Sequence, residues 1–136
     1  MSLRVGVLMG GPSEEKEVSI ATGKAVIKAC TENGYTATEF VFDTDYKKFL
    51  KDLKKQDITF NALHGGIGEN GKIQAWLDEN NIKYTGSGAI ASSLCMDKDI
   101  SKKIAKRNGI ETPDWQLIQR LDQDVKIKLP LSLIHI

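Results

Sequence analysis

The sequence predicts an α/β fold in which helices flank a parallel β-sheet. Short, β-prone apolar runs at 3–9 and 58–63 are each followed by a glycine-rich turn and then by a helical pattern. A third glycine turn, Gly86-Ser87-Gly88, follows a short run at 83–85. Strand-to-helix loops of a parallel sheet emerge at its carboxyl edge, where ligands bind, so we expect the three turns to face one cleft.

The remaining elements follow from the spacing of apolar residues. Residues 14–33 carry apolar or small side chains at helical intervals, and Gly34 is expected to end that helix as a C-cap. Asp97 is placed to cap a later helix. The expected strands are 3–9, 37–42, 58–63, 83–85 and, at the start of a second α/β unit, 115–118; the expected helices are 14–33, 46–53, a run from 73, 87–94 and 99–107.

Composition excludes several classes of protein. The 136 residues are 40% hydrophobic and 27% charged with a formal net charge of +1, as in an ordinary soluble domain. Aspartates balance the lysine-rich segment 46–55, which argues against a nucleic-acid or membrane surface. Cys30 and Cys95 have neither disulfide nor zinc-site spacing. With no signal-like start and no apolar run of about eighteen residues, we expect a cytoplasmic protein.

The first glycine turn favours a cation. It reads Gly10-Gly11-Pro12-Ser13, which differs from the Gly-x-Gly-x-x-Gly pattern of dinucleotide sites. Carboxylates follow in the first helical turn, at Glu14, Glu15 and Glu17. They suit the positive end of a helix dipole but would repel a pyrophosphate, so an ammonium group is the better ligand. The alternative is that all three glutamates only stabilise the helix start.

The loop after the third strand is rich in glycine and carries two titratable groups. Four glycines lie between positions 65 and 71 and allow the backbone to approach a ligand closely. His64 and Glu69 are the titratable residues of 64–71. His64 could bind a ligand or could be a hydrogen-bonded scaffold residue. We expect Glu69 to fix the loop by accepting hydrogen bonds from backbone N–H groups.

Residues 64–75, His-Gly-Gly-Ile-Gly-Glu-Asn-Gly-Lys-Ile-Gln-Ala, resemble the N-terminal signature of the D-alanine–D-alanine ligases, members of the ATP-grasp superfamily. Residues 10–19 and Met96-Asp97-Lys98 are similar to two further motifs of that family, and the resemblance covers roughly 3–130. It implies a Rossmann-like, pre-ATP-grasp substrate-binding domain at 1–96. It also implies the truncated start of an ATP-grasp domain at 97–130.

The resemblance assigns roles to individual residues. Glu15 would orient the ammonium group of the first D-alanine. His64 would lie near the carboxyl group of that substrate and the acyl phosphate formed from it, and Val18 and Gly65 would help to bind the substrate. Lys98, at a helix start where the dipole disfavours a cation, would reach the ATP phosphates. No metal ligand is expected in this chain.

The activity that the resemblance implies is ATP-dependent joining of two D-alanines for peptidoglycan precursors, through an acyl phosphate. ATP and Mg²⁺ (or Mn²⁺) would be the cofactors, with their main ligands outside this chain, and the parent enzyme would be a homodimer. The first alternative is a ligase that joins D-alanine to D-lactate or D-serine. The second is a Rossmann-like domain that binds a ligand without catalysis.

The C-terminal residues 131–136, Leu-Ser-Leu-Ile-His-Ile, depart from the family, which continues there into an ATP-binding strand. The hexapeptide is one translation of CTGTCTCTTATACACATC, which resembles a transposon adapter used in sequencing libraries. We therefore expect a non-native tail on a truncated reading frame. The parent would be an enzyme, and the fragment alone is expected to be inactive.

Overall fold

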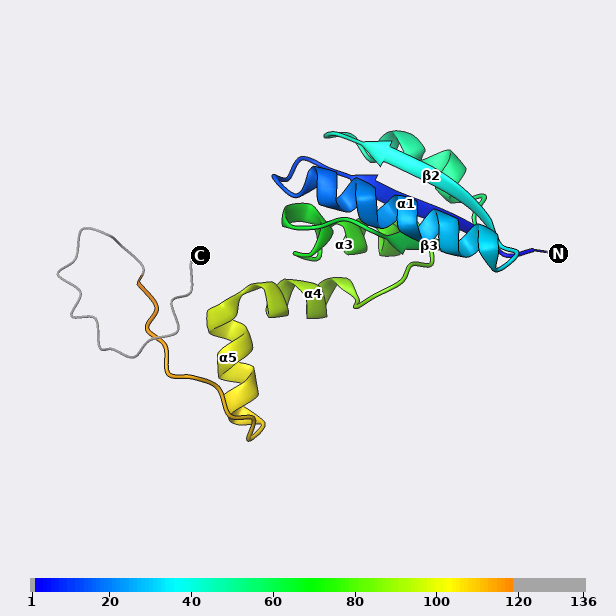
Figure 1. Cartoon of the computed structure of the whole chain (residues 1–136). Coiled ribbons are helices and arrows are strands. Elements are labelled where there is room, and N and C mark those ends of the chain that lie inside the picture. The colour runs from blue at the N-terminus through cyan, green and yellow to red at the C-terminus, as the bar shows by residue number, and fades with distance from the viewer. Residues whose placement is uncertain (1, 119–136) are drawn as a thin grey trace. The chain divides into compact units, whose positions relative to one another are not determined.

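The computed structural model describes residues 2–118 and confirms the predicted fold class, a parallel sheet flanked by helices (Figure 1). The chain divides into two compact units, Met1–Ser93 and Leu94–Ile136. The elements in order are β1 (Arg4–Gly10), α1 (Lys16–Glu32), β2 (Thr36–Phe42), the 3₁₀ turn η1 (Lys47–Phe49), α2 (Leu50–Leu53), β3 (Ile58–Asn61), the 3₁₀ turn η2 (Gly66–Gly68), α3 (Lys72–Glu79), α4 (Ala89–Met96) and α5 (Lys98–Arg107).

The sheet of the first unit has three parallel strands in the order β2-β1-β3. In the register, Arg4 pairs with Thr36 and Val5 with Ile58, so β1 is the central strand. Parallel pairing places the carboxyl ends of all three strands at one edge. The loops that follow β1 and β3 therefore begin next to each other.

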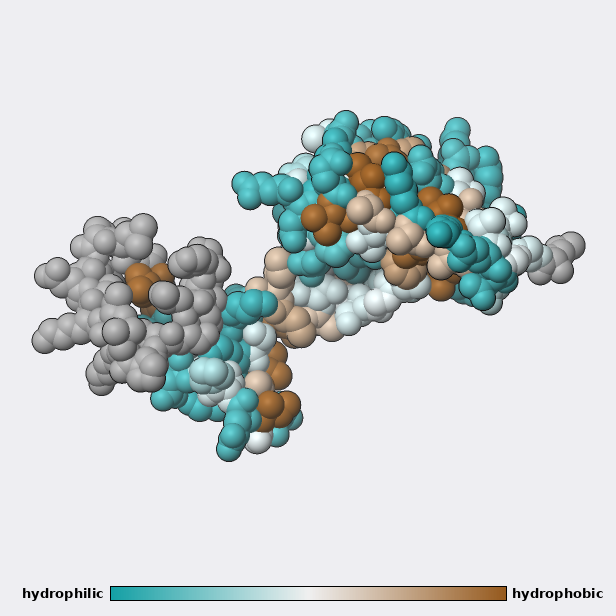
Figure 2. Space-filling view, in the orientation of Figure 1, coloured by the Kyte–Doolittle hydropathy of each residue, from teal (hydrophilic) through white to brown (hydrophobic). Residues whose placement is uncertain are grey.

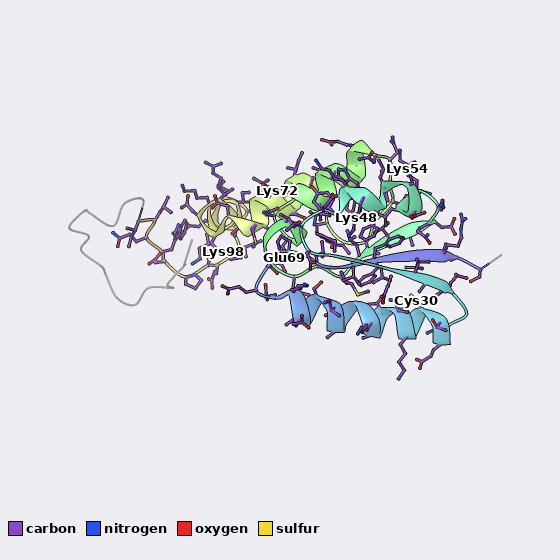
Figure 3. The ribbon with its side chains drawn as sticks, turned by 90° about the horizontal axis from the view of Figure 1, so that it is seen from above. Cys30, Lys48, Lys54, Glu69, Lys72 and Lys98 are labelled. Carbon is purple, nitrogen blue, oxygen red and sulfur yellow. The ribbon has the colours of Figure 1, made fainter. Side chains whose placement is uncertain are left out.

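The alternation of side chains along β1 divides the core into two layers. Val5, Val7 and Met9 pack with apolar residues of α1 on one face. Leu8 points to the opposite face and packs with residues of α2 and α3. Figure 3 shows the same arrangement, with α1 along one face of the sheet and α2 and α3 on the other. Figure 2 shows hydrophobic areas among hydrophilic ones on the face that carries α1.

The end of α1 agrees with the predicted glycine cap. Gly34 has a φ of +79°, in the left-handed region that glycine adopts readily. Its N–H donates to the carbonyl of Thr31 at 3.1 Å, and the N–H of Tyr35 donates to that of Cys30 at 2.9 Å. These two bonds are the Schellman pattern, which satisfies carbonyls at the helix end. The chain can then turn directly into β2.

Three predicted elements differ in the structure. The expected strand at 83–85 is a single bridge between Thr59 and Tyr84, because only this short stretch runs beside β3. The expected helix at 46–53 is η1 followed by the short α2. Residues 115–118 are not a strand, because no strand within 2–118 pairs with them, and Trp115 instead contacts α5.

Two of the predicted features fall wholly or partly beyond residue 118. The proposed tail at 131–136, and the part of the proposed ATP-grasp start beyond residue 118, lie outside the described residues. The boundary at 96–97 stays a prediction. Among residues 2–118, every helix is too short or too polar to cross a membrane.

Candidate functional site

A cavity of about 210 Å³ lies at the carboxyl edge of the sheet, between the loops that follow β1 and β3. Its lining consists of Gly10, the last residue of β1, and of residues from the two loops, which confirms that these two glycine turns face one cleft. The third turn, 86–88, is not part of the lining. The lining residues are Gly10, Gly11, Pro12, Ser13, Leu63, His64, Gly65, Gly66, Ile67, Gly68 and Asn70.

Ser13 joins the two loops. Its hydroxyl donates to the carbonyl oxygen of His64 at 2.7 Å and accepts from the N–H of Glu15 at 3.2 Å. One side chain therefore fixes the backbone at His64 and the backbone at the start of α1. The two residues singled out in the sequence, Glu15 and His64, are thus tied to the same serine.

The carboxylate of Glu15 lies against Gly65. A β-carbon at position 65 would lie 2.5 Å from Oε2 of Glu15, which is closer than any van der Waals contact. Gly65 also has a φ of +65° and a ψ of 172°, a conformation open essentially to glycine alone. Glycine is therefore required here by its backbone conformation, and an added β-carbon would also have to displace the end of the Glu15 side chain.

Two residues of α1 with hydroxyl side chains contact the ends of the strands and the imidazole of His64. Ser19 is fully buried; its Oγ accepts from the N–H of Gly10 at 2.9 Å and donates to the carbonyl of Ala62 at 2.8 Å. Thr22 Oγ1 lies 3.0 Å from Nε2 of His64. One helix, α1, therefore links the end of β1 to the end of β3 and also contacts the histidine.

Glu15, Ser19 and Thr22 are spaced four and three residues apart, so they form one stripe along α1. The sequence analysis assigned a role to Glu15 but missed Ser13, Ser19 and Thr22. The sequence did contain a signal for two of them, because Ser19 and Thr22 follow Glu15 at helical spacing and so lie on the same face of α1. This spacing places the two hydroxyls on the face of Glu15, but it does not identify the groups that they bind.

The acidic start of α1 has no cationic partner among residues 2–118. None of the ion pairs between those residues involves Glu14, Glu15 or Glu17. The neighbouring Lys16 is paired with Asp43 after β2, and this hydrogen-bonded pairing raises the pKa of Lys16 and lowers that of Asp43. The carboxylate of Glu15 is exposed and can accept a cation from outside.

The loop after His64 is fixed by amide side chains, and the expectation for Glu69 was wrong. The carbonyl of Gly68 accepts from Nδ2 of Asn61 at 3.0 Å and from Nε2 of Gln74 at 2.8 Å. Oδ1 of Asn70 accepts from the N–H of Lys72 at 3.1 Å. No donor within 2–118 reaches the carboxylate of Glu69, which is exposed (Figure 3). Amide side chains can do both tasks, because they donate to carbonyls and accept from N–H groups, whereas a carboxylate only accepts.

The other predicted site residues lie elsewhere. Val18 is on α1, one turn after Glu15, with 52% of its surface exposed. Lys98 is exposed at the first position of α5 in the second unit (Figure 3). The predicted cap of α5 is confirmed, since Oδ1 of Asp97 accepts from the N–H of Ile100 at 3.0 Å. Within the described part of the chain, no cluster of His, Cys, Asp and Glu residues could hold a metal ion.

Comparison with known proteins shows one consistent similarity. Residues 39–87 match the family model described as D-ala D-ala ligase N-terminus. The D-alanine–D-alanine ligase of Aquifex aeolicus is 48% identical over 114 residues, which are 84% of this chain and 39% of the relative. That of Pelotomaculum thermopropionicum is 45% identical over 120 residues, 88% of this chain and 37% of the relative.

A solved structure extends the similarity to three dimensions. The D-alanine–D-alanine ligase of Bacillus anthracis complexed with ATP superposes with a TM-score of 0.82 and 40% identity, over 93% of this chain and 41% of that one. The chain therefore spans about two fifths of the length of the proteins that it matches.

Proposed function

Because this chain belongs to the D-alanine–D-alanine ligase family, whose N-terminal part it matches, we propose that the whole protein joins two D-alanines in an ATP-dependent reaction for peptidoglycan synthesis. The residues described here would form the site of the first D-alanine. The observation that carries the proposal is the Glu15 carboxylate. It lies against Gly65, next to His64, without a cationic partner within 2–118.

The ammonium group of the first D-alanine would pair with Glu15. Lys16, the nearest cation in sequence, is paired with Asp43 and does not compete. A charge-assisted hydrogen bond between an ammonium and a carboxylate is roughly twice as strong as a neutral one. The lack of a side chain at Gly65 leaves room beside the carboxylate, and Val18, one turn further along α1, would contribute apolar contact.

The carboxyl group of the same substrate would then lie near His64 and the N–H groups of the glycine loop. When that carboxylate is phosphorylated and attacked, negative charge develops on its oxygen atoms. A fixed donor aimed at this position stabilises the charge more in the transition state than in the ground state. Ser13 and Thr22 hold the backbone and the ring of His64, so the donor is in place before the substrate binds.

ATP would supply the phosphoryl group, and we propose that Lys98 contacts its phosphates. Lys98 is exposed, and the first turn of a helix disfavours a cation unless an anion is nearby. We propose Mg²⁺ only as a cofactor of the whole protein. Residues 2–118 offer no metal-binding cluster, so the ligands of Mg²⁺ would come from other parts of the whole protein.

The second substrate is proposed to be D-alanine, because the named relatives are D-alanine–D-alanine ligases and none is named for D-lactate or D-serine. We also propose that the whole protein is a homodimer and works in the cytoplasm, where ATP and the peptidoglycan precursors meet. Sedimentation of the whole protein would test the dimer.

The decisive experiment is an assay of ATP- and D-alanine-dependent phosphate release. It compares the chain as written with the same chain extended by the C-terminal remainder of a relative such as the Aquifex aeolicus enzyme. We expect activity only in the extended protein. Silence in an extended protein that is verified as folded would reject the ligase and favour a domain that binds a ligand without catalysis.

Glu15→Gln in the extended protein tests the carrying observation. The amide keeps the shape of the side chain but loses the charge, so binding of the first D-alanine should weaken by about 1.5–3 kcal/mol. Glu14→Gln is the matched control and should change little. An unchanged Michaelis constant for the first substrate would remove Glu15 from this role.

A further inference from the structure

The contact between Thr22 and His64 is specific. A threonine within a helix can donate its hydroxyl to the carbonyl four residues earlier. Thr31 does this on α1, with its Oγ1 2.9 Å from the carbonyl oxygen of Ile27. Thr22 lies on the same helix, yet its hydroxyl contacts Nε2 of His64 at 3.0 Å in a half-buried position. The hydroxyl is therefore directed at the imidazole.

The surroundings of the hydroxyl decide the direction of this bond. A neutral imidazole has one nitrogen that donates and one that accepts, whereas a hydroxyl can do either. If Nε2 donated, the hydroxyl hydrogen of Thr22 would need another acceptor, and within residues 2–118 no other hydrogen-bond partner contacts it. If Thr22 donates, Nε2 accepts and both groups are satisfied. The proton of the neutral ring then lies on Nδ1.

We propose that Thr22 is a positioning residue that holds neutral His64 in the form protonated at Nδ1, leaving Nδ1–H as the donor toward the ligand. No residue within 2–118 is hydrogen-bonded to Nδ1. The proposed function supplies the identity of the group that Nδ1–H meets, the carboxyl group of the first D-alanine. Thr22 itself does not contact substrate. It selects which ring nitrogen can donate.

The experiment reads the protonated nitrogen directly, on the complete 136-residue chain with ¹⁵N-labelled histidine. Long-range ¹H–¹⁵N correlation at about pH 8.5, where an ordinary imidazole is neutral, separates protonated from unprotonated ring nitrogens. The chain has two histidines, and a His135→Gln variant identifies the signals of His64. Three variants are compared with the parent: Thr22→Ser keeps the hydroxyl, Thr22→Val removes it at equal size, and Thr31→Val removes a hydroxyl that contacts no histidine.

We expect protonation at Nδ1 in the parent, Thr22→Ser and Thr31→Val chains, and a shift toward a mixture of the two forms in Thr22→Val. A parent spectrum with the proton on Nε2 overturns the proposal, whether or not Thr22→Val folds. An unchanged spectrum in a folded Thr22→Val chain overturns it as well. Because the measurement needs no turnover, a silent ligase assay with Nδ1 protonation intact would count against the proposed function alone.

Discussion

In each of the two units, side chains attach an irregular segment of the chain to a helix, but these attachments use different chemical groups. In the first unit, the hydroxyl of Ser19 on α1 lies at 0% exposure and hydrogen-bonds to the ends of β1 and β3. Thr22 and Ser13 add two more bonds to His64. All of these groups are uncharged except for the titratable imidazole of His64, and the Ser19 hydroxyl is buried away from water.

In the second unit, the segment after α5 is attached through charged groups. The carboxylate of Asp99 accepts from Nε1 of Trp115 at 2.8 Å and from Nζ of Lys103 at 2.6 Å. The ammonium groups of Lys102 and Lys106 each lie 5.3 Å from the centre of the Trp115 ring, a cation–π arrangement. The lysines themselves are largely solvent-exposed or half-buried.

This difference determines which attachment responds to solution conditions. Buried hydrogen bonds between uncharged groups do not titrate and are not screened by salt, so they keep a site in one geometry. Attachments that depend on a carboxylate and on lysines weaken at low pH and at high salt. We therefore expect the bonds that Ser13 and Ser19 make to be insensitive to conditions that release Trp115.

Ser19→Ala should have the largest effect. It leaves the buried N–H of Gly10 and the buried carbonyl of Ala62 without partners, which costs about 1–3 kcal/mol for each group. We expect the free energy of unfolding to fall by about 2–4 kcal/mol in urea denaturation followed by circular dichroism. The loss should be the same in low and in high salt.

Thr31→Ala is the control for Ser19→Ala, because it removes an exposed hydroxyl from the same helix. It should change stability by no more than about 0.5 kcal/mol. A Ser19→Ala loss as small as that of the control would show that water replaces the two bonds. The contrast between buried and exposed attachments would then be broken.

Gly65→Ala should have the next largest effect. The backbone at position 65 is in a region that costs about 1–3 kcal/mol for a residue with a side chain. The new methyl group would also displace the carboxylate of Glu15, which lies 2.5 Å from its position. We expect a lower free energy of unfolding by about 1–3 kcal/mol, measured by the same denaturation.

The double variant Gly65→Ala/Glu15→Ala separates the two contributions to the Gly65→Ala effect. If the carboxylate contributes, the double variant recovers part of the loss, because the methyl group no longer meets an oxygen atom. If nothing is recovered, the whole effect is backbone strain. Recovery of the full loss would contradict the strain argument from the φ of +65°.

The sequence predicted the sheet, the helix ends and the loops of the site well, because these depend on local patterns. Glycine turns after apolar strands placed the cavity, and Gly34 marked the end of α1. The bonds of Ser19 could not be predicted, since they join positions 43 residues apart that meet only when β1 and β3 pair. A hydroxyl residue in a helix gives no sign of its distant partner.

Two of the wrong predictions have physical causes that the structure shows. Glu69 was expected to hold its loop by accepting from backbone N–H groups, but Asn70 accepts from the N–H of Lys72, and the carbonyl of Gly68 accepts from amide side chains such as Gln74. Residues 115–118 have strand-like side chains, but a strand forms only beside another strand, and Trp115 finds a better partner in Asp99. For residues 115–118, a contact made elsewhere in the chain overrode the local propensity.

Acid should release Trp115 without disturbing the buried hydrogen bonds of Ser19 in the first unit. Hydrogen bonds from Lys103 and Trp115 lower the pKa of Asp99 below its ordinary 3.8. The contribution of the carboxylate is therefore complete above about pH 4 and is lost as the pH falls through the lowered value. We expect the emission of Trp115, obtained as the difference between the parent and Trp115→Phe, to shift to longer wavelength below about pH 4.

Asp99→Ala should show the acid-type emission already at neutral pH, because both hydrogen bonds to the carboxylate are gone. Asp114→Ala is the matched control, since Asp114 is 89% exposed and its oxygen lies 3.6 Å from Nζ of Lys106. An Asp99→Ala spectrum identical to that of the parent would mean that the lysines over the ring hold Trp115 by themselves.

The smallest effect is expected for Asp57, and it sharpens the comparison because this charged, exposed attachment belongs to the first unit. Asp57 accepts from the guanidinium of Arg4 at 2.8 Å and 3.2 Å and from its backbone N–H at 2.8 Å, which lowers the pKa of the carboxyl from 3.8 to about 2. The stability that Asp57 contributes is therefore present above about pH 4 and is lost as the pH falls through about 2.

Urea denaturation of the parent and Asp57→Asn should show a small difference at neutral pH, reduced by about 1 M salt and absent near pH 2. If the difference persisted in acid and in salt, the unit in which an attachment lies would determine its sensitivity to pH and salt. If the difference disappears, the charge and exposure of the attachment determine that sensitivity.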